Sequence, residues 1–399
     1  MRKFLTPTIL YLSVISFFTD IASEMLFPVL PLYLMALGYS PLVIGALEGF
    51  AEAVSGLGKV FFGHLSDRSG KRNIFIKIGY AISALSKPAI GLTSSLSGIF
   101  VAKFADRVGK GIRTAPRDAL IIAESDQSVR GKAFGFHRAL DTLGAVIGPV
   151  IGLLLLIRFN FDYSKIFFFA IIPGLLAVLF TFLIKKEKSA ASPAEIKKAP
   201  TLKTFIDFWR QASPMFKKMV LGFTMFSFVN SSNVFLILRT RDLGLPDLWI
   251  LGVYIVYNTT YALASYPLGA LGDRYGFKNT YLAGLFIFSL SYGLLGFGGS
   301  SIVFFVSSFV LYGLFSAIDD GSAKAWLSLH VPPEFKATGL GLQLSLSAIG
   351  FFVSSVVTGV LYITLGGTIT FILLSMAGLF VITYFIFIVP DAENKNRHI

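Results

Sequence analysis

The chain has 399 residues, of which 54% are hydrophobic and only 14% are charged, and its mean hydropathy is +0.73. Soluble domains carry about 25% charged residues, so this composition excludes an ordinary soluble protein and indicates one that crosses a membrane several times. The lack of cysteine excludes disulfides, thiolate metal ligands and a cysteine nucleophile. The four histidines show no metal-ligand spacing, so we expect no metal site and no cofactor.

Apolar runs long enough to span a bilayer recur along the chain. A polar, basic, proline-containing linker at 186–216 separates a first group of spans (1–185) from a second group with a short tail (217–399). We therefore predict an all-α membrane protein with twelve transmembrane helices in two pseudo-symmetric six-helix bundles. The predicted spans are 8–37, 41–64, 73–94, 97–122, 131–157, 164–185, 217–238, 248–271, 279–298, 301–325, 336–362 and 366–389.

Lys and Arg lie mostly at alternate connections between these spans. The N-terminus, the linker and the tail are basic, whereas the connections near residues 40, 95, 299 and 365 carry no Lys or Arg. This asymmetry predicts that both termini and the linker are cytoplasmic, with Arg158 and Arg239 to Arg241 as mild exceptions. The same distribution points to a membrane, not to nucleic acid, as the partner of the +13 net charge. No small-residue cleavage site follows the first apolar run, so we do not interpret it as a signal peptide.

A short motif occurs twice, as GHLSDRSGKR (63–72) and as GALGDRYGFK (269–278), with an offset of 206 residues. Its glycines permit a tight turn, its Asp can face a helix N-terminus, and its Arg can face a carboxylate. Two copies in register indicate duplicated halves, the architecture of secondary transporters, where a single copy could be an ordinary charged loop. The matching pairs are Gly63 and Gly269, Asp67 and Asp273, Arg68 and Arg274, and Gly70 and Gly276.

This motif resembles the signature loop between the second and third helices of the major facilitator superfamily. Three more stretches resemble the family, namely Arg107 followed by Gly111, the antiporter-like Gly148-Pro149 within GAVIGPVIG, and Asp20 followed by Pro28 and Pro31. The resemblance is to twelve-span bacterial drug- or metabolite-proton antiporters and covers nearly the whole chain except the linker and tail. It implies alternating access and a central cavity lined by the first, fourth, seventh and tenth helices. The chain departs from the family in the high charge of its fourth span.

The fourth span carries its charges on one side. On a helix, these residues fall within an arc of roughly 140°. A charged residue that faces lipid at mid-bilayer costs about 2.5–3.5 kcal/mol, so this face must meet water, counter-charges or both. The residues are Lys103, Asp106, Arg107, Lys110, Arg113, Arg117 and Asp118.

Carboxylates on neighbouring spans can form ion pairs with these cations. Asp20 and Glu24 in the first span, and Glu48 and Glu52 in the second, are four residues apart and share a helix face. The family architecture implies that the first pair approaches the cations of the fourth span. A buried carboxylate beside a cation can bind and release a proton, which predicts a role in coupling. The alternatives are static salt bridges that only hold the bundle together and, for Glu48 and Glu52, a gate.

The second half offers acidic and neutral groups. Asp319 and Asp320 line up with residues 113 and 114 at the same offset, and Asn230 and Asn233 are polar residues within the seventh span. A cationic N-terminal wall and an acidic or neutral C-terminal wall suit a substrate with a carboxylate or phosphate, bound mainly by the N-terminal half. The alternative is that the two aspartates only neutralise the fourth span. In the fifth span, we expect His137 to be a partner of Asp141.

Two sets of site residues follow from these patterns. The predicted substrate and proton-coupling residues are Asp20, Glu24, Glu48, Glu52, Arg107, Lys110, Arg113, Asp141, Asn230, Asn233, Asp319 and Asp320. The predicted gating and signature-loop residues are Gly63, Asp67, Arg68, Gly70, Arg117, Asp118, Gly148, Pro149, Gly269, Asp273, Arg274 and Gly276.

The sequence therefore predicts a monomeric multi-pass transporter of a bacterial inner membrane whose partners are lipid, protons and a small-molecule substrate. We expect proton-coupled export of a small organic anion or amphiphile by antiport. Proton- or sodium-coupled uptake of an anionic metabolite or metal chelate is the alternative, followed by a non-transporting receptor on the same scaffold. An enzyme is not expected, because the sequence offers no nucleophile–base arrangement and no metal cluster.

Overall fold

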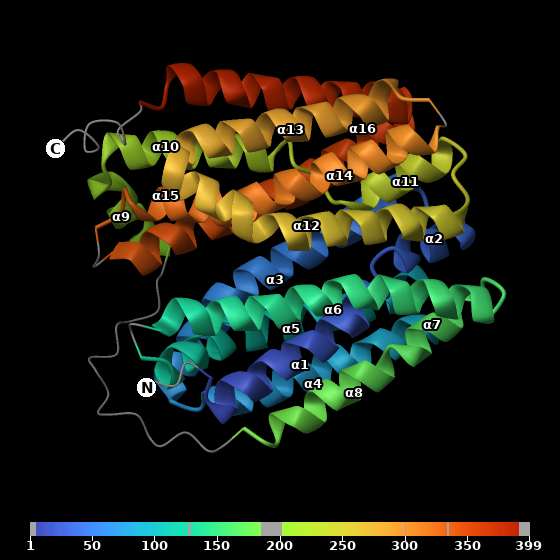
Figure 1. Ribbon diagram of the computed structural model, residues 1–399, viewed down its shortest axis with the longest axis horizontal. Coiled ribbons are helices and arrows are strands. Elements are labelled where there is room, and N and C mark those ends of the chain that lie inside the picture. Colours follow the sequence, from blue (N-terminus) through green and yellow to red (C-terminus); the bar gives the residue numbers. More distant parts are fainter. Residues whose placement is uncertain (1–4, 127–128, 185–201, 300, 333–334, 391–399) are drawn as a thin grey trace. The chain divides into compact units, whose positions relative to one another are not determined.

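The computed structural model describes residues 5–126, 129–184, 202–299, 301–332 and 335–390, and only the backbone of Leu202, Asp273, Lys336 and Ala337. Within these residues the secondary structure is helical, without strands (Figure 1). Contacts divide the chain into two compact units: unit 1 comprises Met1–Tyr39 and Phe50–Ala199, and unit 2 comprises Ser40–Gly49 and Pro200–Ile399.

Unit 1 is built from the helices that run from blue to green in Figure 1. Helix α1 packs along α6, and α4 packs along α5, around a core that includes Ile15, Tyr80 and Ile121. Ser and Thr side chains cap two of the helices, since Thr6 accepts from the backbone of Ile9 at the start of α1, and the hydroxyl of residue 95 does the same for α5. The helices are α1 (Pro7–Glu24), α2 (Val29–Ala36), α3 (Pro41–Ser69, which begins in unit 2), α4 (Arg72–Gly91), α5 (Leu96–Glu124), α6 (Arg130–Arg158), α7 (Tyr163–Phe169) and α8 (Ile171–Thr181).

Unit 2 has an aromatic core. The ring of Phe288 lies 5.2 Å from that of Phe226 and 5.0 Å from that of Phe315, both edge-to-face. Gly366, at φ +79°, breaks the last long helix, where we expected a boundary between two spans. The helices are α9 (Leu202–Gln211), α10 (Pro214–Ser227), α11 (Val234–Asp242), α12 (Asp247–Tyr275), α13 (Phe277–Phe297), α14 (Ile302–Ile318), the π-helix η2 (Asp319–Ala323), α15 (Lys324–Ser328) and α16 (Lys336–Phe387).

Several spans that we expected to be continuous are interrupted. The first is broken at 25–28 between α1 and α2, and the seventh is broken at 228–233 between α10 and α11. Proline 28 lacks a backbone donor, and Asn and Ser side chains compete for backbone groups, which explains both breaks. Shifted by 206 residues, 25–28 becomes 231–234, so the two breaks fall at equivalent places. Part of the expected linker is also helical, as α9, while residues 186–201 lie outside the described residues.

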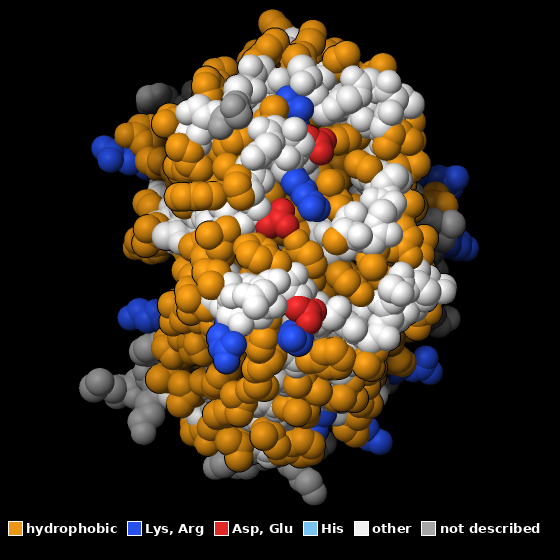
Figure 2. Space-filling model, turned by 90° about the vertical axis from the view of Figure 1, so that its right-hand side faces the viewer, with side chains coloured by type: hydrophobic (Ala, Val, Ile, Leu, Met, Phe, Trp, Pro, Cys, Tyr) orange, Lys and Arg blue, Asp and Glu red, His pale blue; other side chains and the backbone are white. Residues whose placement is uncertain are grey.

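Many large apolar side chains are exposed, as is typical of a surface that faces lipid. Examples are Leu179, Phe182, Leu263 and Phe380, each more than 60% exposed. Figure 2 shows one face of the structure, on which hydrophobic side chains predominate and charged ones are few. Six helical segments of the described chain are long and apolar enough to cross a bilayer. They are Pro7–Ala36, Arg130–Arg158, Tyr163–Thr181, Phe277–Phe297, Ile302–Ser328 and Thr338–Phe387.

The repeated motif forms the same turn in both units. Gly70 follows α3 with φ +64°, and Gly276 follows α12 with φ +93°, a backbone region that strongly favours glycine. In unit 1 the carboxylate of Asp67 accepts a hydrogen bond from the guanidinium of Arg72 at 2.9 Å, which joins the end of α3 to the start of α4. The glycines of the motif are therefore required by backbone geometry.

Candidate functional site

The charged face of α5 lies against α4 because both helices carry glycine at their contact. A Cβ atom on Gly109 would lie 2.6 Å from the carbonyl oxygen of Gly79 and 3.0 Å from the backbone nitrogen of Ser83. The backbones are too close there for a side chain on Gly109. This approach brings Ser83 and Lys87 of α4 to the charged face of α5.

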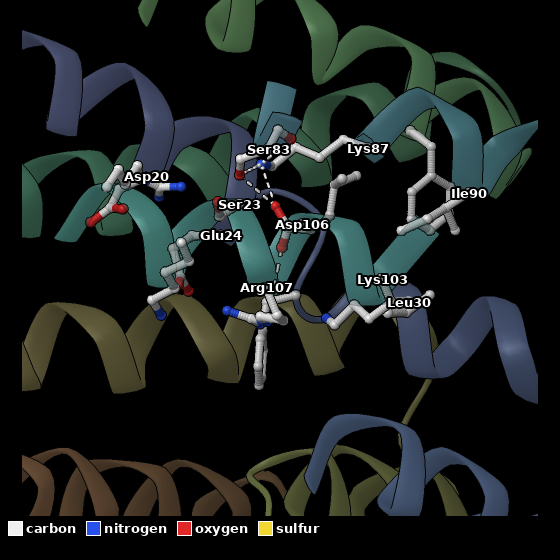
Figure 3. Close-up of a pocket in the computed structure, with 15 residues that line it drawn as sticks. Asp20, Ser23, Glu24, Leu30, Ser83, Lys87, Ile90, Lys103, Asp106 and Arg107 are labelled. Carbon is white, nitrogen blue, oxygen red and sulfur yellow. Dashed lines mark hydrogen bonds and ion pairs between the residues drawn. The ribbon is translucent and has the colours of Figure 1, made fainter. Parts of the chain in front are cut away.

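A cavity of about 60 Å³ opens beside this face, inside unit 1 (Figure 3). Five cations and three carboxylates line it, and Ile90, Phe167 and apolar residues of α1 and α2 complete its walls. The cavity is therefore net cationic. The charged lining residues are Asp20, Glu24, Lys87, Lys103, Asp106, Arg107, Lys110 and Arg113.

A buried ion pair joins α4 to α5 in the wall of this cavity. The ammonium of Lys87 lies 3.0 Å from Asp106 Oδ1 and also donates to the hydroxyl of Ser83 at 3.0 Å. Arg107 Nε lies 3.8 Å from the other oxygen of Asp106. None of the three charged residues is more than 8% exposed, so the two cations and the carboxylate stabilise one another away from water.

Lys87 lines the site but was not among the residues predicted from the sequence. It is a single lysine in the otherwise apolar second half of the span predicted at 73–94, and a buried lysine there requires an anionic partner. Its ion pair with Asp106 shows that part of the charge on α5 is neutralised within the α4–α5 pair.

The remaining cations have different surroundings. Glu52 of α3 lies 3.2 Å from Arg107 Nη1 and 3.8 Å from Lys110 Nζ, so the second span does supply a counter-charge. Arg113 stacks on the ring of Tyr80, with 4.5 Å between its Cζ atom and the ring centroid. Among the residues that the structure describes, Nε and Nη1 of Arg113 have no hydrogen-bond partner, although both atoms are buried.

The predicted acid Asp20 reaches the cavity beside a second carboxyl. The side chains of Asp20 and Asp141 are close enough to hydrogen-bond to each other, which requires that one of the two carboxyls carries a proton. Asp141 also accepts from Ser16 and lies 3.4 Å from Arg138, while Arg117 donates to Ser16 at 3.2 Å. Two neighbouring carboxyls beside several cations are chemically competent to take up and release a proton.

One expectation for this region differs from the structure. The ring nitrogens of His137 are buried and form no hydrogen bond with any described residue, so His137 is not the hydrogen-bonding partner of Asp141. Arg117 and Asp118 pair with each other at 2.9 Å, as neighbours on one turn. Glu48 is buried on the part of α3 that belongs to unit 2, whereas Glu52 belongs to unit 1.

Glycines of α6 place the acids of α1. A Cβ atom on Gly148 would lie 2.8 Å from the carbonyl oxygen of Ile21, and one on Gly152 would lie 2.8 Å from that of Met25. A Cβ atom on Gly144 would meet the carbonyl oxygen of Phe17 in α1 most closely and would lie 3.2 Å from the Cβ atom of Asp20. The GAVIGPVIG stretch is therefore a close helix contact in unit 1, and it fixes Asp20 next to Asp141.

We expect Gly148→Val to destabilise the purified protein by about 1–3 kcal/mol, because the added side chain must push α1 away from α6. The matched control is Gly135→Val in the same helix, since a Cβ atom there would meet nothing within 4 Å. Thermal unfolding in detergent checks both variants. Equal losses in the two would mean that helix propensity, and not the contact with α1, sets the cost.

The signature-loop residues lie at the ends of helices. Their surroundings differ between the copies, since Gly63 is packed against Ala115 of α5, whereas the space around Gly269 is open. Arg68 is exposed, and Arg274 lies 5.3 Å over the ring of Tyr275. Pro149 is buried inside α6, and the side chain of Asp273 lies outside the described residues.

In unit 2 the predicted residues separate into two places. Asn233 accepts a hydrogen bond from the hydroxyl of Tyr312 at 2.6 Å and so ties the α10–α11 break to α14. Asn230, Asp319 and Asp320 line a separate cavity of unit 2. Across the described residues, no group of three or more His, Cys, Asp or Glu side chains could hold a metal ion.

Comparison with known proteins gives consistent matches. The family model described as Major Facilitator Superfamily matches residues 12–258 and 242–398. An uncharacterised MFS-type transporter of Methanocaldococcus jannaschii is 32% identical over 370 residues, which are 90% of this chain and 89% of the relative. The quinolone resistance protein NorA of Staphylococcus aureus is 26% identical over 221 residues, 55% of each chain. The crystal structure of the nucleoside transporter NupG covers 95% of this chain and 98% of its own, with a TM-score of 0.72 at 15% identity, and so shares the fold.

Proposed function

Because the chain belongs to the Major Facilitator Superfamily, a family of multi-pass membrane transporters, we propose that it is a proton-coupled secondary transporter that exports a small organic anion or amphiphile. The family is not enzymatic, which agrees with the expectation from the sequence. A relative named for quinolone resistance supports export, since a transporter confers resistance by lowering the amount of drug inside the cell.

The observation that carries the substrate class is the net cationic cavity of unit 1, where five cations meet three carboxylates. Lys87 and Arg107 already pair with the buried Asp106, but Arg113 has two nitrogens without a partner among the described residues. A carboxylate or phosphate entering the cavity would satisfy these donors with charge-assisted hydrogen bonds. A cation would instead add to the positive charge.

The coupling site in this proposal is the carboxyl pair of Asp20 and Asp141. In this proposal a proton is shared by the pair between α1 and α6, and Asp20 also lines the substrate cavity. An anion arriving in the cavity and a proton leaving the pair act on the same local charge, so the cavity and the carboxyl pair are electrostatically linked. With the cavity empty the nearby cations favour the ionised pair, and a bound anion favours the protonated pair. This linkage alone would move anion and proton together, as in the alternative of proton-coupled uptake, so antiport requires that the two bind in opposite conformations of the transporter.

The proposal includes twelve crossings of a prokaryotic cytoplasmic membrane by a monomer with both termini in the cytoplasm. Six segments are apolar enough to span by composition alone. They cover seven of the predicted spans, because Thr338–Phe387 contains the last two. The other five carry charges, as α5 does, or polar residues, as α10–α11 and α12 do, and cross because those groups face the interior of the protein.

Transport in proteoliposomes tests the proposal. A pH-sensitive dye is trapped inside, and 3-phenylpropionate, an anionic probe with an aromatic body, is added outside. Antiport predicts that the interior becomes more alkaline, because each entering anion expels a proton. In Asp20→Asn and Asp141→Asn, this proton movement should be lost.

An interior that becomes more acidic would support the alternative of proton-coupled uptake, and transport of the anion only with sodium would indicate sodium coupling. If only the uncharged analogue 3-phenylpropanamide is transported, the anion assignment is wrong.

A further inference from the structure

Unit 2 contains a cavity of about 300 Å³ with a different chemistry from that of unit 1. It is formed by α10, α13, η2, α15 and α16, and aromatic side chains make up much of its wall. The rings of Phe223 and Phe226 both contact that of Tyr281, with centroids 5.1 Å and 6.4 Å away, respectively. This wall is therefore already packed in place before any ligand binds.

The polar groups of this cavity are mainly hydrogen-bond acceptors. The side-chain oxygens of Asn230 and Gln343 are buried and have no hydrogen-bond partner in the described part of the chain. Asp319 is half-buried and forms no hydrogen bond or ion pair with a described residue; the charges that act on it most are those of Asp320 and Lys324. Acceptors without donors are costly in an apolar cavity.

The neighbouring carboxylate, that of Asp320, already has hydrogen-bond and ion-pair partners. Asp320 accepts from the hydroxyl of Tyr261 at 2.9 Å and from the ammonium of Lys324 at 2.8 Å. Lys324 is the cation in the lining of this cavity, and its ion pair with Asp320 neutralises one of the two carboxylates. The carboxyl of Asp319 is left as the group without a direct partner among the described residues.

The backbone gives these acids an unusual setting. Asp319 to Ala323 form a π-helix between α14 and α15, where the wider turn replaces the regular helical hydrogen bonds. Such turns occur often at functional sites, because they change the direction of side chains within a helix. Here the turn carries both aspartates, and both line the cavity.

We propose that this cavity binds an organic ammonium ion with an apolar or aromatic body. The N–H groups of the ammonium would satisfy Asp319 and the oxygens of Asn230 and Gln343, and the aromatic wall would contact both the cation and the apolar body. A neutral apolar molecule would fill the space but leave the acceptors unsatisfied. An organic anion would meet Asp319 with a like charge. This ligand class differs from the one proposed for unit 1 and does not depend on the direction or coupling of transport.

Equilibrium binding to the purified full-length protein in detergent tests this inference. Three probes share one carbon skeleton and differ only in charge: 3-phenylpropylammonium, 3-phenylpropanol and 3-phenylpropionate. We expect the ammonium to bind at least tenfold more tightly than the alcohol, and we expect Asp319→Asn to remove that difference. Loss of one charge-assisted hydrogen bond corresponds to about a tenfold change or more.

Asp320→Asn is the matched control, since it changes the adjacent carboxylate, which already has partners. It should weaken ammonium binding less than Asp319→Asn does, and Phe223→Leu should weaken binding of both the ammonium and the alcohol. Retention of binding by the 319 variant would overturn the proposal, as would equal affinity for the ammonium and the alcohol in the unmodified protein. Because no transport is measured, failure of the proposed transport activity would leave this result interpretable.

Discussion

Lys87→Met is expected to lower the free energy of unfolding by about 3–5 kcal/mol, the largest stability effect that the structure predicts. The substitution leaves Asp106 with its charge buried between α4 and α5, and Asp106 is 8% exposed. Ser83 and Arg107 remain near it, but the close ammonium partner at 3.0 Å is gone. The three tryptophans of the chain allow unfolding in detergent to be followed by fluorescence.

The double variant Lys87→Met, Asp106→Asn separates a broken pair from a lost side chain. Asn keeps a hydrogen-bond partner for Ser83 and removes the buried charge, so we expect the double variant to recover more than half of the lost stability. A strong positive coupling in this cycle would confirm the pair as a structural ion pair. If the stability losses of Lys87→Met alone and of Asp106→Asn alone simply add in the double variant, the cost of Lys87→Met comes from packing and not from the uncompensated charge of Asp106.

The sequence was sufficient to predict the family and the helical fold, because both depend on features that are local in the chain. The repeated Gly70 and Gly276 turn is a backbone requirement, and an offset of 206 residues between two such turns identifies the duplication directly. The membership of the family is confirmed by the match to residues 12–258 and 242–398. The number of crossings and the orientation of the termini stay predictions.

Partners across helices were harder to predict than the helices themselves. The seven charges of the fourth span share one face, but helical periodicity does not tell which neighbouring helix approaches that face most closely. This depends on Gly79 and Gly109, where the backbones of α4 and α5 meet, and on Gly148, which brings α1 to α6. As a result Lys87 was missed, and Asp20 was not expected beside Asp141.

Average hydropathy also could not predict the interruptions within the spans. A window average is insensitive to the three polar residues at 230–232 or to a single π turn at 319–323, since their neighbours are strongly apolar. Both features lie beside predicted site residues. Local departures from regular helix are therefore more informative about the site in this protein than average hydropathy is.

Arg113→Gln is expected to weaken binding of 3-phenylpropionate by about 10- to 100-fold, the largest functional effect predicted for a single side chain. Arg113 is 6% exposed and lines the cavity of unit 1, and its guanidinium has two buried nitrogens without a partner among the described residues. Charge-assisted hydrogen bonds from such a group contribute about 1.5–3 kcal/mol, and each 1.4 kcal/mol is tenfold in affinity. Arg113→Lys keeps the charge but loses the planar fork, so an intermediate loss is expected.

The stability of the same variant distinguishes a binding role from a structural one. Arg113 has no ion pair with a described residue, so its replacement leaves no carboxylate uncompensated; only the stacking on Tyr80 is lost, at about 0.5–2 kcal/mol. Arg274→Gln is the matched control, since Arg274 also lies over a tyrosine ring, at 5.3 Å, but not in the cavity. It should show a similar or smaller loss of stability with unchanged affinity for the anion. If Arg113→Gln binds the anion normally, or if it fails to fold while Arg274→Gln folds, Arg113 holds the bundle together and the cationic cavity is not the anion site.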